Sequence, residues 1–178
     1  MSHATLSSGP ISPRRPRARG FTLMELMVTI AVLALLVAIG VPTFRDATLG
    51  SRLSAAANNL LASVQLARSE AIKRNQPITL CASSDGATCA GTGDWEQGWI
   101  VVDGAANVVQ HQQALPAGYR VLQAGGTAPL AFQPIGIGAT AANFTICRDD
   151  PIGRQERLMS LSAAGSAYVS RSTSGSCP

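Results

Sequence analysis

The longest apolar run of the chain lies near its beginning and sets the first constraint on the fold. The run extends from Leu26 to Val41 and is closed by Pro42, and Glu25 is the only charge between Phe21 and Val41. A helix from Phe21 to Val41 rises about 30 Å, which is enough to cross the hydrocarbon core of a bilayer. Four arginines and no acidic residue precede Glu25. This bias predicts a single-pass protein whose N-terminus stays in the cytoplasm while the rest of the chain crosses the membrane.

Two features at the start of the run separate it from an ordinary membrane anchor. In a secretory signal a small-residue cleavage site follows the apolar segment, whereas here the small residue, Gly20, precedes it. Glu25 lies inside the apolar segment, where an unpaired charge is costly and therefore indicates a function. The alternative is a plain signal anchor with a glutamate near its end, and the combined context favours a dedicated processing signal.

The residues Gly20-Phe21-Thr22-Leu23-Met24-Glu25 ahead of the apolar run resemble the class III signal of type IV pilins and pseudopilins. The resemblance implies that a prepilin peptidase cleaves after Gly20 and that the new terminus, Phe21, is N-methylated. It also implies that Glu25 pairs with the N-terminal amine of a neighbouring subunit, because opposite charges in lipid cost far less together than apart. The implied partners are other pilins or pseudopilins bound through the N-terminal helix, the peptidase, and an inner-membrane assembly platform.

The net charge of the chain belongs mostly to its first residues. The chain has 14 Lys and Arg against 10 Asp and Glu, and four of the arginines lie within residues 1–20. Cleavage after Gly20 therefore leaves 10 basic against 10 acidic residues. A mature protein without net formal charge argues against binding to a polyanion through overall charge, so a basic face has to be local.

Four segments are expected along the chain. Residues 1–20, rich in proline and without apolar periodicity, form a cleaved prepilin leader. Residues 21–42 form the transmembrane and assembly helix, and residues 43–76 continue it as an amphipathic helix. Residues 77–178 form a globular β-domain with disulfides. Pro42 is expected to kink the helix without ending it, since helical patterning resumes beyond it.

The amphipathic continuation is predicted from apolar residues at spacings of three and four, which define one face of a helix that packs on the globular domain. This stripe consists of Leu49, Leu53, Ala56, Leu60, Val64, Ala67 and Ala71. The residues Asn75-Gln76-Pro77 are expected to stop the helix.

Beyond Pro77 the pattern changes to short β-rich runs separated by turns. The expected strands are 77–82, 99–102, 107–111, 119–122, 130–132, 143–146, 157–161 and 167–170. There is no βαβ alternation and no second long helix, which favours an α+β fold with one antiparallel sheet or two small packed sheets on the helix. Two sheets are the favoured arrangement.

Several segments of the mature chain resemble the GspH/FimT group of minor pilins and pseudopilins. They are Gln65–Ile72, a strand ending at a cysteine, Trp95–Asp103, the Phe132-x-Pro134-x-Gly136 turn, and Phe144–Cys147. The resemblance implies a pilin-like fold and a structural subunit that packs into a pilus or pseudopilus and supports its assembly. Within it, Trp99 and Phe132 are interpreted as core aromatics on strands.

All four cysteines follow the membrane segment: Cys81, Cys89, Cys147 and Cys177. An even number of cysteines in an exported domain indicates disulfides, and three connectivities are possible. We favour Cys81–Cys89, which closes a short polar loop, and Cys147–Cys177, which ties down a Ser-rich tail. Neither pair has the spacing of a zinc ligand set.

Catalytic, metal and cofactor sites are not expected. His111 has no acid or nucleophile near it in sequence and is interpreted as a solvated side chain. Gly136-Ile137-Gly138 lacks the Lys and the following helix of a phosphate-binding loop. Asp149-Asp150 lacks the spaced oxygen ligands of a calcium loop and is interpreted as an Asx-type turn. The protein is therefore expected not to be an enzyme.

Three interaction roles remain: a minor type IV pilin, a type II secretion pseudopilin acting in protein export, and a FimT-like minor pilin that binds DNA for uptake. The first is slightly favoured, and gene neighbourhood would separate it from the second. For the third, the resemblance implies a Gly-Arg-x-Arg motif, where this chain has Gly165-Ser166-Ala167-Tyr168. The arginines that remain as DNA-binding candidates are Arg148, Arg154, Arg157 and Arg171. Neighbouring acids offset most of their charge, so support for DNA as a partner is weak.

Overall fold

The computed structural model describes residues 20–91, 94–149, 155–173 and 177. The chain divides into two compact units, Met1–Pro42 and Thr43–Pro178. One helix, α1 (Leu23–Arg74), has 52 residues and passes through Pro42 without ending there, as expected. Of the expected leader, residues 1–20, only Gly20 lies within the described residues.

The first unit is the apolar start of α1. Thr22 caps the helix, because its carbonyl oxygen accepts from Leu26 N at 3.1 Å and its hydroxyl from Glu25 N at 3.2 Å. The segment Leu23–Val41 has a mean hydropathy of 2.5, and none of it is buried within the structure. It meets the length and composition of a membrane span.

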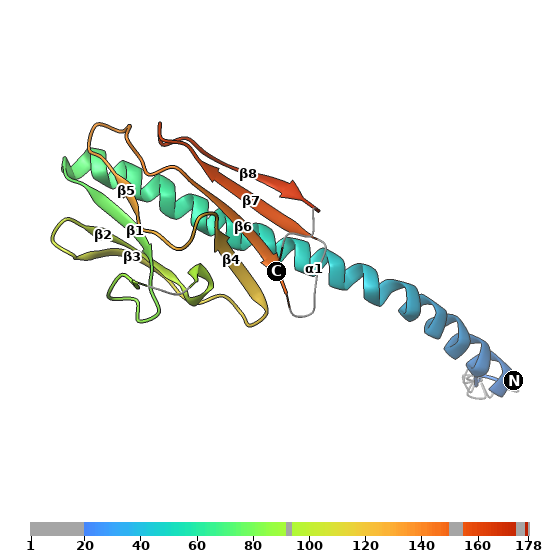
Figure 1. Ribbon diagram of the computed structural model, residues 1–178. Coiled ribbons are helices and arrows are strands. Elements are labelled where there is room, and N and C mark those ends of the chain that lie inside the picture. The colour runs from blue at the N-terminus through green and yellow to red at the C-terminus, as the bar shows by residue number, and fades with distance from the viewer. Residues whose placement is uncertain (1–19, 92–93, 150–154, 174–176, 178) are drawn as a thin grey trace, which may run out of the picture. The chain divides into compact units, whose positions relative to one another are not determined.

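The second unit holds two antiparallel four-stranded sheets and the second half of α1 (Figure 1). The first sheet has the order β3-β2-β1-β5 and consists of β1 (Ile78–Ala82), β2 (Trp99–Asp103), β3 (Val108–Gln112) and β5 (Leu130–Phe132). The second has the order β4-β6-β7-β8 and consists of β4 (Tyr119–Gln123), β6 (Ala142–Arg148), β7 (Glu156–Leu161) and β8 (Ala167–Ser172). The expected α+β fold with two sheets is confirmed.

Both sheets pack on the predicted stripe of α1 in one hydrophobic core. All seven residues of the stripe are buried, from Leu49 to Ala71. Trp99 and Phe132 are each 1% exposed, which confirms them as core aromatics. The alanines of the stripe are small enough for the strands to lie close to the helix backbone, and the large side chains of the sheets fill the space between.

The end of α1 follows from its last residues. Asn75 adopts a left-handed conformation with φ of 51°, and its N–H donates to Ile72 O at 3.3 Å. The N–H of Gln76 donates to Ala71 O at 3.3 Å. These two hydrogen bonds form a Schellman motif, which satisfies the last helical carbonyls, and Pro77 then prevents the helix from continuing.

The eight expected strands all occur, with differences at their ends. β6 was expected over 143–146 and extends over Ala142–Arg148, because β4 and β7 pair with it on both sides and hold its ends. A short 3₁₀ helix, η1 (Trp95–Gln97), was not expected. Three residues carry no periodicity from which a helix can be predicted.

Candidate functional site

The residues of the expected processing signal lie at the exposed start of the first unit. Gly20 and Phe21 precede α1, and the Phe21 side chain is 79% exposed. Glu25 is exposed in the first turn, where the helix dipole favours an acidic side chain. Cleavage after Gly20 would place the new amine at Phe21, four residues before the Glu25 carboxylate. The arrangement provides an accessible peptide bond and a single acid beside it.

The apolar surface of the first unit continues along the whole span. Large side chains such as Leu23, Ile30 and Ile39 are exposed by 77%, 58% and 71%, respectively. The hydroxyl of Thr29 donates to Leu26 O at 2.8 Å, so this hydroxyl inside the span is satisfied within the helix. Such a surface is stable only when lipid or other apolar helices cover it.

Arg157, one of the four DNA-binding candidates, is not at the surface. It is 6% exposed, and its guanidinium donates to Ser54 Oγ at 3.1 Å, Gly50 O at 3.1 Å and Glu156 O at 2.8 Å. Its burial counts against the hypothesis that it gathers with the other candidate arginines on one exposed face. β7 brings it against α1, and the sequence could not indicate which helix residues it would meet.

The other arginine candidates differ in their surroundings. Arg148 ends β6 and lies over the ring of Tyr119, with Cζ 5.6 Å from the ring centroid. Arg171 is exposed on β8, directly opposite Arg157 in the ladder of β7 and β8. Arg154 lies outside the described residues. Among the described candidates, therefore, only Arg157 and Arg171 are cross-strand neighbours.

The Cys81–Cys89 disulfide closes a loop that is organised by one carboxylate. The structure contains this disulfide, with a Cα–Cα distance of 5.5 Å. Within the loop, Asp85 accepts hydrogen bonds from the Ala87 and Thr88 backbone N–H groups and from the Thr88 and Ser83 hydroxyls. These hydrogen bonds, with that from the Thr88 N–H contributing most, hold the pKa of Asp85 far below its ordinary value. The hydrogen bonds of the carboxylate all come from residues of this loop, so its role is to stabilise the loop conformation.

The Cys147–Cys177 disulfide, also as favoured from the sequence, joins β6 to the C-terminal tail with a Cα–Cα distance of 5.8 Å. The described part of the chain contains no free cysteine. Nor does it contain a group of three His, Cys, Asp or Glu side chains placed to hold a metal ion. His111, the histidine within the described residues, is exposed on β3 and its ring lies against Gly86 in the disulfide loop.

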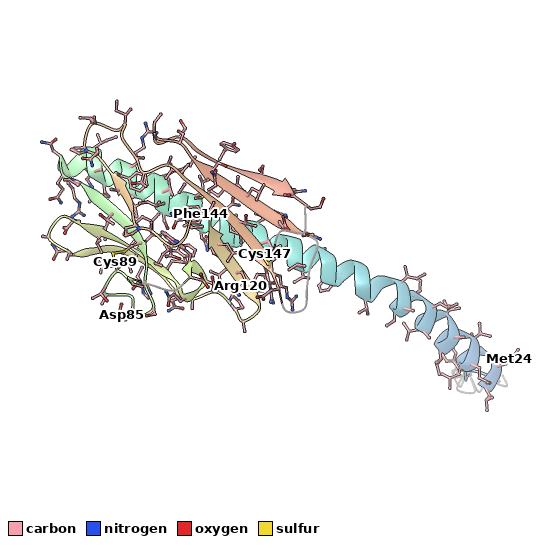
Figure 2. All side chains as sticks on the ribbon, in the orientation of Figure 1. Met24, Asp85, Cys89, Arg120, Phe144 and Cys147 are labelled. Carbon is pink, nitrogen blue, oxygen red and sulfur yellow. A yellow bond between two sulfur atoms is a disulfide. The ribbon has the colours of Figure 1, made fainter. Side chains whose placement is uncertain are left out.

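Sequence reasoning missed an ion-pair network that joins η1 to the second sheet. Its centre is Arg120 on β4, which is labelled in Figure 2. Arg120 contacts three carboxylates: Asp94 at 3.0 Å, Glu96 at 2.7 Å and Asp149 at 3.2 Å. Their negative charge, that of Glu96 first, raises the pKa of Arg120 above its ordinary value. Because all three carboxylates pair with Arg120, the network links η1 and the end of β6 to β4. Asp149, expected in an Asx-type turn with Asp150, belongs to this network, and Asp150 lies outside the described residues.

A second missed contact fixes two loops to α1. Arg68 donates to Gly136 O at 3.0 Å and to Gly165 O at 3.1 Å. Both glycines have a positive φ, 75° and 77°, which other residues rarely adopt. The Phe132-x-Pro134-x-Gly136 turn and the β7–β8 turn are therefore held by a single helix side chain. The only sequence signal was Arg68 itself, an arginine on the partly buried border of the helix.

Family comparisons cover most of the chain. Residues 56–165 match the family described as Type II transport protein GspH. Residues 15–41 match the prokaryotic N-terminal methylation motif. The first match includes the second half of α1 and most of both sheets, and the second includes Gly20, Phe21 and Glu25.

Individual proteins give the same picture. The type IV minor pilin FimU of Pseudomonas aeruginosa has a structure that superposes with a TM-score of 0.53 at 25% identity, over 66% of this chain and 92% of that chain. The minor pseudopilin EpsH of the Vibrio cholerae type 2 secretion system superposes with a TM-score of 0.50 at 14% identity, over 67% of this chain and 96% of that chain. The type IV major pilin protein PilA of Myxococcus xanthus is 44% identical over 52 residues, which are 29% of this chain and only 24% of PilA.

Proposed function

This chain belongs to the GspH family, and we propose that it is a minor subunit of a type IV pilus. The observation that carries the proposal is the combination of a GspH-type domain with an apolar helix that starts at Gly20-Phe21 and has Glu25 in its first turn. A pilin or pseudopilin is a structural subunit. Its apolar helix anchors it in a membrane before assembly and gives it a surface on which other such helices pack afterwards.

The proposed route to the fibre begins in the inner membrane. The chain lies there with its N-terminus in the cytoplasm and its globular unit in the periplasm, an environment that suits its two disulfides. A prepilin peptidase cleaves after Gly20, and Phe21 becomes the N-methylated terminus. An inner-membrane assembly platform then transfers the subunit into the fibre. No catalytic step by this chain itself is part of the proposal.

Glu25 is proposed to register the subunit against its neighbour. Its carboxylate is the acid within the span, and the amine of a neighbouring Phe21 would neutralise it. A pair of opposite charges in an apolar surrounding costs much less than either charge alone. A subunit without this acid would still enter the membrane, because insertion depends on the apolar residues.

The test is incorporation of Glu25→Ala into fibres in the native host, with Glu25→Asp as the matched control that keeps the charge. We expect Glu25→Ala to be processed and inserted normally yet absent from sheared fibres, while Glu25→Asp is retained in part. Normal incorporation of Glu25→Ala would refute the role of this residue.

The alternative role is that of a pseudopilin in a type II secretion system, which would use the same leader, helix and β-domain. The likeness to the FimU structure at 25% identity favours the pilus, whereas the likeness to EpsH at 14% identity reflects the fold alone. Deletion of the gene separates the two roles. Loss of surface fibres with normal export of folded proteins supports a pilin, and the opposite result supports a pseudopilin.

DNA binding is the third candidate role and has less support. Arg157 is buried, and Arg148 lies over Tyr119. Affinity for DNA depends on the number of phosphates that exposed cations neutralise. Salt-dependent titration of the full chain with DNA tests this role. Absence of binding at low salt would remove it.

A further inference from the structure

A hollow of about 460 Å³ opens beside α1 in the second unit. The described residues that surround it are small or polar, and none of these carries a carboxylate: they include Gly50, Ser51, Ser54, Gln155, Arg157 and Arg171. The Gln155 side chain lies close to Gly50, since a Cβ at this position would meet Gln155 Oε1. The hollow therefore combines two cations with hydroxyl groups.

Arg157 is a buried cation whose hydrogen bonds go only to neutral oxygens. Its three acceptors are the Ser54 hydroxyl and the carbonyls of Gly50 and Glu156. No described carboxylate forms an ion pair with it. A guanidinium has five N–H groups, so two remain for a further acceptor. Burial of a charge without a counter-charge is costly, and an anion would compensate for it.

Arg171 increases that cost. It faces Arg157 directly in the antiparallel ladder, where like charges destabilise the pair. Among the described residues, no side chain hydrogen-bonds or ion-pairs with Arg171. Burial first, and the charge of Arg171 second, lower the pKa of Arg157. Two neighbouring cations that pair with no acid within the described part of the chain form a site that an anion stabilises.

We propose that this hollow binds the phosphate of an anionic lipid head group. Two guanidinium groups match the oxygens of a phosphate in a planar, bidentate manner. The Ser51 hydroxyl at the rim adds a further donor for the phosphate or its glycerol. The proposal requires that α1 be anchored in a bilayer, and it does not depend on which fibre the subunit joins.

The position of the hollow in the sequence favours a lipid. Ala47, which lines it, lies six residues beyond Val41, the last residue of the apolar span. Six residues reach at most about 21 Å even when fully extended, so the chain itself limits how far Ala47 can lie from the end of the span. A DNA strand would need a row of exposed cations, whereas two arginines in one hollow suffice for a single phosphate.

The experiment uses the full chain in uncharged detergent micelles and follows the arginine side-chain Nε–Hε signals by NMR. Short-chain phosphatidylglycerol is titrated first, then inorganic phosphate and a short single-stranded DNA in separate samples. Arg171→Gln removes one cation of the hollow. Arg52→Gln is the matched control, because Arg52 is exposed on the same helix and does not line the hollow.

We expect saturable shifts of the Arg157 and Arg171 signals with phosphatidylglycerol. Arg171→Gln should weaken the binding at least about tenfold, as for the loss of a hydrogen bond to a charged group, and Arg52→Gln should leave it unchanged. Ser51→Asp, which places a carboxylate at the rim, should also abolish it. Equal effects of Arg171→Gln and Arg52→Gln, absence of saturation, or binding of inorganic phosphate or DNA in preference to the lipid would each overturn the proposal.

Discussion

At the scale of single residues, two core tryptophans carry N–H groups that need partners inside the protein. Trp99 Nε1 donates to Ser63 Oγ on α1 at 2.9 Å, and Trp95 Nε1 donates to Gln123 Oε1 on β4 at 3.0 Å. Trp95 also meets Phe144 in an edge-to-face contact with ring centroids 5.1 Å apart. Trp95, in η1 between β1 and β2, is thus joined to β4, and Trp99, on β2, is joined to α1.

Ser63→Ala is expected to lower the free energy of unfolding by about 1–3 kcal/mol, because it leaves the buried Trp99 N–H without an acceptor. The measurement is chemical denaturation of the chain in detergent. Ser69→Ala is the control, since Ser69 makes a similar hydrogen bond to the helix backbone but is exposed, and a change within about 0.5 kcal/mol is expected for it. An equal effect of the two substitutions would show that the Trp99 contact contributes nothing.

Asp85 is expected to make stability depend on pH at the acidic end. Its pKa in the folded state lies below the ordinary value of an aspartate, about 3.9. The folded state therefore gains stability above that value and loses it progressively as the pH falls below about 4. Thermal unfolding of the wild type and of Asp85→Asn, measured from neutral to acidic pH, tests this. The variant should lose less stability on acidification, and parallel curves would contradict the expectation.

The surroundings of Arg157 could not be predicted from the sequence. Arg157 was a DNA-binding candidate at the start of the expected strand 157–161, and the observed strand β7 begins one residue earlier, at Glu156. The burial of Arg157 depends on β7 meeting Gly50 and Ser54, which lie more than a hundred residues earlier in the sequence. The same holds for Ser63 and Trp99, whose contact joins a helix to a strand. Periodicity predicts which face is buried, but it does not predict which polar atoms meet there.

At the scale of elements, local patterns predicted most of the fold. The apolar stripe of α1 and the end of this helix at Asn75 could be predicted from the sequence, because helix periodicity and capping depend on residues within a few positions of each other. η1 and the Arg120 network could not be predicted. Asp94 lies 26 residues before Arg120 in the sequence, so no local spacing predicts the contact of Asp94 and Glu96 with Arg120.

The two disulfides should contribute unequally to stability. Cys81 and Cys89 are 8 residues apart, and Cys147 and Cys177 are 30 residues apart. If the constraint on the unfolded chain dominates, the shorter loop is worth about 2.5 kcal/mol and the longer one about 3.6 kcal/mol. The pairs Cys81→Ala/Cys89→Ala and Cys147→Ala/Cys177→Ala are the matched variants. Denaturation in detergent should show the larger loss for the second pair, and the reverse order would mean that the Asp85 loop depends on its disulfide for folding.

At the scale of the whole molecule, two units with opposite solvent preferences share one chain. The first exposes an apolar helix, while the second buries its apolar residues in a core between α1 and both sheets. The apolar helix is stable in lipid or against other helices, and the second unit is stable in water. A subunit of this kind can be stored in a membrane before assembly. Its helix can then pack against the helices of other subunits while its globular unit stays folded.

Processing should change the charge of the molecule and not its fold. Removal of residues 1–20 takes away four arginines and leaves equal numbers of basic and acidic residues. In the proposed orientation, with the N-terminus in the cytoplasm, those arginines would oppose extraction of the helix from the membrane, because they would have to cross it. Cleavage after Gly20 is therefore expected to be the step that allows the subunit to leave.

Gly20→Val tests that step, because a bulky side chain at the residue before the cleaved bond should block the peptidase. Intact-mass analysis of the wild type is expected to give a mature N-terminus at Phe21 with one added methyl group, and Gly20→Val should keep the full leader and remain in the membrane fraction. Gly40→Val is the control, since Gly40 is also a glycine with open space around its Cα, located within the span and away from the cleaved bond. It should be processed as the wild type is. A mature terminus at any other residue, or normal processing of Gly20→Val, would mean that the signal at Gly20-Phe21 does not direct cleavage.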